Sequence, residues 1–225
     1  MPLLLSKNLT SLASLLFPLS CISCGLSGTS HCRSCQDPWL QPHFAHLDNL
    51  PLMWMTRYSS ATAHIILAAK EDNDRTAQLI LAQSLDHALS HAISKGLCAN
   101  RELLLVPIPS AKSASRKRGH FHLRTVAKAM QSDFQFLELL EPARHLQDQS
   151  NLDRDQRLRN TSGAYRVKVR YSSDPTWISR IENRHVILFD DLITTGSSLR
   201  EAVRALKVAK ISPELALSAC AVRAR

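Results

Sequence analysis

The residues best suited to chemistry lie near the C-terminus of this 225-residue chain. Asp190 and Asp191 follow an apolar run of strand length, and a hydroxyl-rich loop with one glycine comes next: Thr194, Thr195, Gly196, Ser197 and Ser198. Backbone N–H groups and hydroxyls in such a loop, before a helix, form a pocket for a phosphate. Carboxylates repel a bare phosphate, so this pair suits the hydroxyls of a sugar or a Mg²⁺ ion. A ribose 5-phosphate group therefore fits both halves of the segment.

A second chemically capable group is a pair of C-x-x-C motifs near the N-terminus. Cys21 and Cys24 form one motif, and Cys32 and Cys35 form the other. Four sulfurs arranged in this way suit a tetrahedral Zn²⁺ ion, and a closed four-thiolate site favours a structural role. Clustered cysteines of this kind indicate metal binding in a reducing, cytoplasmic compartment. Three nearby histidines are substitute ligands in principle, and we expect them to be exposed and unliganded: His31, His43 and His46.

Charge and glycine content limit the classes of function. The formal net charge is +9, and residues 112–225 hold all of this surplus, because Lys and Arg balance Asp and Glu over residues 1–111. The surplus indicates anionic partners such as phosphates, nucleotides or nucleic acid. The chain has only 6 glycines, none in a P-loop or G-x-G-x-x-G arrangement. We therefore expect neither an ATPase P-loop nor a dinucleotide-binding Rossmann site.

Apolar patterns predict the elements that position these residues. Continuous apolar runs predict buried parallel strands over residues 103–106, 185–189 and 215–222. Alternation from Tyr165 to Val169 predicts an edge or half-exposed strand. Apolar residues at helical spacing predict helices over residues 62–69, 76–93, 123–130 and 199–206. Strands that alternate with helices favour an α/β domain with a mainly parallel sheet.

The composition divides the chain into four parts. We expect an amphipathic N-terminal helix, a zinc-ribbon-like module, a linker rich in Pro, His and Trp, and the α/β domain, over residues 1–20, 21–36, 37–58 and 59–225. The first part resembles an export signal, but polar residues interrupt its apolar run and Pro18 ends it. No run reaches the roughly 18 apolar residues of a membrane helix, so we expect no transmembrane segment.

The acidic and hydroxyl-rich segment resembles the phosphoribosyl pyrophosphate (PRPP) signature of type I phosphoribosyltransferases. Further segments are similar in order and spacing to the ComF family, zinc-ribbon phosphoribosyltransferase-like proteins that include the GntX group: Leu15–Pro18, Val106–Pro109, Arg116–Gly119 and Gln149–Tyr165. The resemblance implies a type I phosphoribosyltransferase fold with a mainly parallel sheet and a small four-cysteine zinc module. It also implies Mg²⁺-dependent PRPP binding and a role in DNA uptake during natural transformation. After Gly119 the family usually has an aromatic residue and then Asn or Asp, where this chain has His120, Phe121 and His122.

The resemblance also implies roles for single residues. Asp190 and Asp191 take the ribose hydroxyls, and the loop from Thr194 to Ser198 takes the 5-phosphate. Lys112 follows a buried strand at the edge where α/β sheets bind ligands, so we expect it to face the pyrophosphate. Arg157 lies in the flap that closes over PRPP, where it would neutralise the departing pyrophosphate beside the acidic pair. Two further basic residues are expected to contact PRPP: Arg116 and Arg118.

Simpler interpretations stay open for each motif. The two acids could cap a helix or be solvated, with the loop an ordinary turn. The basic segments around Arg116 and Arg157 could be solvated surface, which is the more frequent role of charge runs.

Three functions are compatible with the sequence. The first is a phosphoribosyltransferase, whose acceptor has no readable motif. The second is a non-catalytic adaptor that binds single-stranded DNA with the DNA-uptake machinery; positive charge and a zinc module favour it, whereas the 5% aromatic content offers few stacking platforms. The third is a PRPP-sensing regulator without turnover. Four basic residues have no task in any of these sites: Arg200, Arg204, Lys207 and Lys210.

Overall fold

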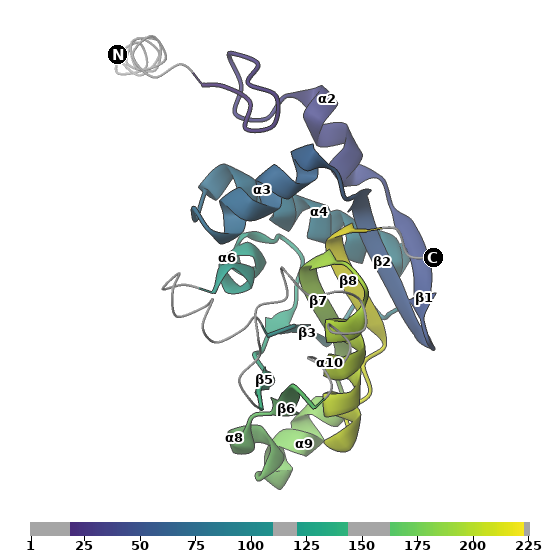
Figure 1. The fold of residues 1–225 in the computed structure, drawn as a ribbon. Coiled ribbons are helices and arrows are strands. Elements are labelled where there is room, and N and C mark those ends of the chain that lie inside the picture. Colours follow the sequence, from purple (N-terminus) through teal and green to yellow (C-terminus); the bar gives the residue numbers. More distant parts are fainter. Residues whose placement is uncertain (1–18, 110–120, 144–162, 223–225) are drawn as a thin grey trace, which may run out of the picture.

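The computed structural model describes residues 19–109, 121–143 and 163–222 (Figure 1). At its centre is a six-stranded sheet with the strand order β1-β2-β8-β7-β3-β4. The strands are β1 (His43–Leu47), β2 (Leu50–Arg57), β3 (Leu103–Pro107), β4 (Gln135–Phe136), β7 (His185–Ile193) and β8 (Leu215–Ala221). Neighbouring strands are parallel except in the β1–β2 hairpin. The predicted α/β class with a mainly parallel sheet is therefore confirmed.

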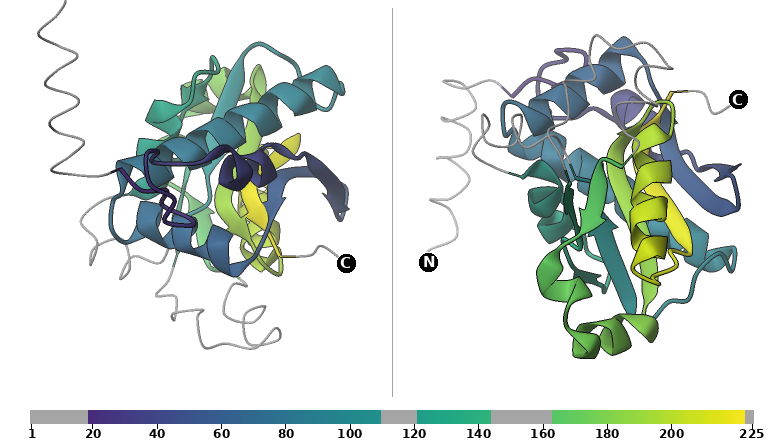
Figure 2. Two further views of the ribbon diagram at one scale, coloured as in Figure 1. Left: turned by 90° about the horizontal axis from the view of Figure 1, so that it is seen from above. Right: turned by 60° about the horizontal axis from the view of Figure 1, so that its bottom comes forward.

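Helices cover both faces of this sheet (Figures 1 and 2). One face packs against α3 (Ser60–Lys70), α4 (Arg75–Ser94) and α6 (His122–Ala129). The other packs against α10 (Ser197–Val208), a small β5–β6 sheet (Leu140–Pro142 and Tyr165–Val167), α8 (Val169–Ser172) and α9 (Pro175–Glu182). None of the helices in the described segments is long and apolar enough to span a membrane.

Strand β3 shows why the central strands are continuously apolar. Leu103 and Leu105 pack into the cluster beneath α3, α4 and α6, whereas Leu104 and Val106 pack into the cluster beneath α10. Successive side chains point to opposite faces, and both faces are covered. This arrangement confirms the buried parallel strand predicted over residues 103–106.

Residues 37–58 are not a linker, so that prediction is wrong. They form the short 3₁₀ helix η1 (Asp37–Leu40) and both strands of the β1–β2 hairpin, and β2 pairs in parallel with β8. The Pro, His and Trp content predicts an irregular connection, but His and Trp side chains of this segment pack within the fold. Trp39 is buried in the core, and His43 stacks on Trp54 with ring centroids 5.5 Å apart.

Two other boundaries differ from the prediction. The predicted half-exposed strand ends at Val167, because Val169 already begins α8. Strand β7 continues beyond Phe189 to Ile193, so the acidic pair belongs to its last residues. Most of the predicted N-terminal helix lies in residues 1–18, outside the described part of the chain.

Candidate functional site

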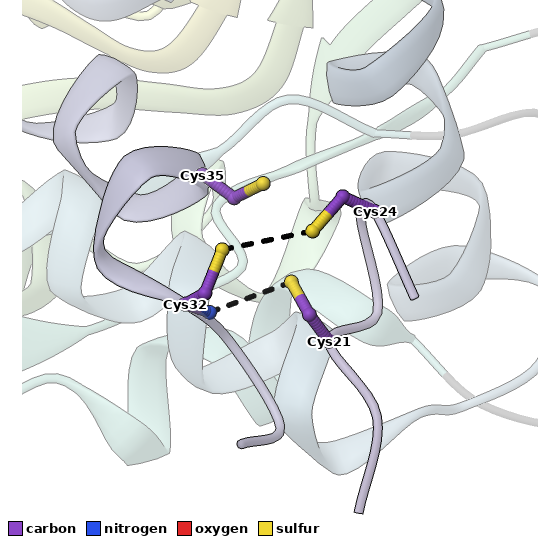
Figure 3. Close-up of side chains that lie close together, drawn as sticks. All are labelled: Cys21, Cys24, Cys32 and Cys35. Atoms are coloured by element: carbon purple, nitrogen blue, oxygen red, sulfur yellow. Dashed lines mark hydrogen bonds between the residues drawn. The ribbon is translucent and has the colours of Figure 1, made fainter. Parts of the chain in front are cut away.

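The four N-terminal cysteines form one cluster (Figure 3). The sulfurs of Cys21, Cys24, Cys32 and Cys35 all lie within 4.8 Å of one another, and the Cys24 and Cys32 sulfurs are 3.6 Å apart. A tetrahedral ion with Zn–S bonds of about 2.3 Å separates its sulfurs by roughly 3.8 Å. The cysteines are therefore placed to bind one metal ion such as zinc, as their spacing predicts.

Backbone geometry turns these sulfurs toward one point. Gly25 adopts a positive φ of 75°, and its N–H donates to the Cys21 carbonyl over 2.8 Å, which closes the first turn. The N–H of Cys32 points at the Cys21 sulfur over 3.4 Å. Burial by itself raises the pKa of Cys21, but backbone N–H groups, led by that of Cys32, lower it to about 6. These donors favour the thiolate, which is the form that binds metal.

Crowding has the opposite effect on Cys35. Its hydrogen bond with the Cys32 sulfur, its burial and the nearby sulfurs of Cys24 and Cys21 raise its pKa to about 12. A divalent cation among the four sulfurs would offset this repulsion and release protons on binding. Proton release is thus an expected signature of metal uptake by this cluster.

The three histidines considered as substitute ligands lie outside the cysteine cluster. His46 is exposed, as expected, but His31 and His43 are half-buried, so the expectation of exposure is wrong for these two. Burial lowers the pKa of His31, and its Nε2 is buried with no hydrogen-bond partner in the described part of the chain. Among the described residues, the metal-binding group consists of the four cysteines alone.

Replacing Cys24 by Ala should remove metal binding and loosen the module. Three remaining thiolates bind Zn²⁺ more weakly, and we expect at least a roughly 100-fold loss of affinity. The module is joined to the body through Ile22, which packs on the core, so the melting temperature should also fall. Zinc content by mass spectrometry and thermal unfolding with and without a chelator measure both effects. Cys98→Ala is the matched control, because Cys98 lies in the core away from the cluster and its loss should leave the zinc stoichiometry at one.

The acidic pair lies at the carboxyl end of β7, near the middle of the sheet. Asp191 is buried, and its Oδ2 lies 2.7 Å from Nε2 of His122, the first residue of α6. His122 is itself only 2% exposed, and its Nδ1 has no hydrogen-bond partner in the described residues. Helix α6 therefore supplies a buried partner for one of the two carboxylates.

The two carboxylates have very different pKa values. Burial by itself raises the pKa of Asp191, but the charge and hydrogen bond of His122 and the charge of Lys70 hold it below its usual range. Burial raises the pKa of Asp190, and the charge and hydrogen bond of Asp191 raise it further, well above the usual range. Adjacent carboxylates with opposite shifts are typical of sites that bind or transform a ligand.

The hydroxyl-rich loop follows directly and leads into α10. Gly196 caps this helix with a positive φ of 73°, and the Thr195 and Ser197 hydroxyl oxygens are 2.9 Å apart. Arg200 donates from its guanidinium to the Thr195 carbonyl over 3.2 Å, which ties the loop to the first turn of the helix. Strand, acidic pair, loop and helix therefore occur in the predicted order at the carboxyl end of β7.

The simpler interpretation of the acidic pair is not supported. The N-cap of α10 is Gly196, five residues after Asp191, so neither acid caps this helix. Asp191 is 4% exposed, which excludes a solvated carboxylate at that position. Both acids therefore belong to the carboxyl end of strand β7.

Replacing Gly196 by Ala should strain the loop. A β-carbon there would lie 2.9 Å from Cδ1 of Leu47, but that methyl is the flexible end of a side chain and can move. The left-handed backbone is the larger cost, about 1–2 kcal/mol for a residue with a β-carbon. Urea unfolding should show a loss of this size, and adding Leu47→Ala should recover little of it. Recovery of most of the stability in the double variant would assign the cost to the methyl contact instead.

Several predicted site residues fall outside the described part of the chain: Lys112, Arg116, Arg118 and Arg157. The described residues that flank them are anchored near the loop. The Tyr165 hydroxyl donates to the Pro109 carbonyl over 3.1 Å, and the Tyr165 N–H donates to Glu201 of α10 over 3.1 Å. Pro109, after β3, and Tyr165, in β6, are thereby held together beside α10.

Sequence reasoning missed His122 and Lys70. The available signal for His122 was a polar residue four positions before Val126, on the apolar face of a short amphipathic helix. Lys70 ends α3 and acts on the acidic pair by its charge, which no local pattern reveals. The chain matches no protein-family model, and a search of curated proteins finds no match.

Proposed function

We propose that this chain binds PRPP at the carboxyl end of β7, in a fold of the type I phosphoribosyltransferase kind with a zinc module like that of the ComF family. The observation that carries the proposal is the paired Asp190 and Asp191, followed by a loop in which Gly196 caps α10 with a left-handed backbone. The loop N–H groups and hydroxyls suit the 5-phosphate, and the acids suit the ribose hydroxyls.

The contacts of Asp190 and Asp191 suggest a different role for each carboxylate. Asp191 is committed to His122 and so acts as a fixed negative charge. Asp190 accepts the backbone N–H of Asp191 over 2.9 Å. A carboxylate has about four acceptor positions, so Asp190 has room to take ribose hydroxyls or to hold Mg²⁺ that enters with PRPP. Either partner would offset the cost of its ionised form.

PRPP is a better candidate ligand than DNA, because part of the positive charge on α10 is already paired with acidic residues. Arg200 lies 3.2 Å from Asp48, and Arg204 lies 2.7 Å from Glu201. Paired cations release fewer counterions on binding a nucleic acid, so they contribute less to DNA affinity. A phosphate ester held by loop N–H groups does not need these side chains.

Calorimetric titration of PRPP, with and without Mg²⁺, tests this function. We expect one site per chain and tighter binding with Mg²⁺, and at least a tenfold loss of affinity in Asp190→Ala. Asp133→Ala is the matched control, because Asp133 is exposed and precedes β4, at the amino end of the parallel strands and away from the acidic pair. The absence of heat with wild-type protein would overturn the proposal. Pyrophosphate released from PRPP with candidate amines and nucleobases then tests for transfer.

A further inference from the structure

A separate cavity lies where the cysteine module meets the carboxyl end of β2. Its volume is about 570 Å³, within the range of about 300–1,000 Å³ typical of small-molecule sites. Ser23, Ser34 and Cys35 of the module form one wall, and Thr56 and Arg57 at the end of β2 form another. Strand β8 lies between β2 and β7, so about 10 Å of sheet separates this cavity from the acidic pair.

The walls of this cavity are rich in hydroxyl groups. Ser23, Ser34 and Thr56 all line it. Ser34 is exposed, so its side chain is open to a ligand in the cavity. A hydroxyl of this kind can donate a hydrogen bond to a carboxylate or phosphate oxygen.

The charge of the cavity is positive. Its described lining contains Arg57 and His43 but no Asp or Glu. Arg57 has no ion pair with any described residue. His43 and Arg57 both line the cavity. Burial lowers the pKa of His43, and the positive charge of Arg57 lowers it further. An anion between them would relieve this repulsion.

We propose that this cavity is a binding site for a small organic anion, whose carboxylate or phosphate is held by Arg57 and the hydroxyl of Ser34. Pro38, which is exposed and also lines the cavity, offers an apolar surface to the body of such a ligand. The site uses none of the residues of the β7 edge. It therefore stands or falls independently of PRPP binding.

The ring resonances of His43 report on this cavity alone. With the full chain loaded with Zn²⁺ and labelled in its histidine rings, we would titrate adenosine 5′-monophosphate as the phosphate probe and benzoate as the carboxylate probe. His43→Gln assigns the resonance. We expect at least one probe to shift this resonance saturably and to raise the pKa of His43, and the stronger probe identifies the anionic group that the site prefers.

Variants separate this site from the β7 edge. Arg57→Ala should weaken the response of His43 at least tenfold, since a charge-assisted hydrogen bond is lost. Arg33→Ala is the matched control: Arg33 is an exposed arginine of the same module that does not line the cavity. Asp190→Asn should leave the response unchanged. A His43 resonance that neither probe shifts at 10 mM, roughly the weakest affinity of interest, or a response that persists in Arg57→Ala, would overturn the proposal.

Discussion

Replacing His122 by Leu is expected to lower the free energy of unfolding by about 3–5 kcal/mol, the cost of leaving a buried charge without its partner. His122 and Asp191 are 2% and 4% exposed, and their side chains meet at 2.7 Å. Leu fills a similar volume but cannot donate to the carboxylate. Urea unfolding at pH 7 measures the loss directly.

The pH dependence identifies the cause of that loss. The pKa of Asp191 is depressed in the folded protein, so its ionised form contributes stability above the unfolded pKa of 3.8. This contribution disappears as the pH falls below about 4 toward the folded pKa. The difference in stability between wild type and His122→Leu should therefore shrink in acid. A packing defect would give a difference that does not change with pH.

Two further variants control for the position of His122. His122→Gln keeps a donor that can reach the carboxylate, so we expect it to recover at least half of the stability. Arg124→Ala, on the same helix, removes an exposed ion pair with Glu138 and should cost less than about 1 kcal/mol. If His122→Gln were as unstable as His122→Leu, the hydrogen bond would not be the main contribution.

The sequence predicts well what depends on neighbouring residues. The four cysteines form their cluster because each C-x-x-C turn places two sulfurs locally, and contacts over a short sequence distance join the two turns. The continuous apolar runs of β3 and β7 likewise report burial on both faces. These features need little knowledge of the rest of the fold.

What the sequence does not predict depends on distant contacts. His122 and Asp191 are 69 residues apart, and only the tertiary fold brings the first residue of α6 to the carboxyl end of β7. Strand β2 was mistaken for a linker because its pairing partner, β8, lies more than 150 residues further along the chain. The opposite pKa shifts of the acidic pair follow from the same tertiary contacts. The sequence alone therefore does not assign different chemical roles to Asp190 and Asp191.

Asp190→Asn is expected to stabilise the protein while it weakens PRPP binding at least tenfold. The pKa of Asp190 is raised well above 3.8, so its ionised form at neutral pH costs stability. Asn keeps an oxygen for the Asp191 N–H and removes the charge. We expect a gain of about 0.5–2 kcal/mol at pH 7, the usual size of a stabilising substitution at a functional site.

The sign of the pH dependence is opposite to that expected for the His122 variant and so separates the two carboxylates. As the pH falls below the raised pKa of Asp190, the folded wild-type carboxyl takes up its proton and the advantage of Asn shrinks, until it disappears near the unfolded pKa of 3.8. Asp191→Asn should instead lower stability at pH 7, because His122 loses its charged partner. Thermal unfolding at pH 5 and pH 8, combined with PRPP titration, measures both properties. A less stable Asp190→Asn protein would mean that the ionised carboxylate is already compensated within the fold, and that Asp190 has a structural rather than a ligand-binding role.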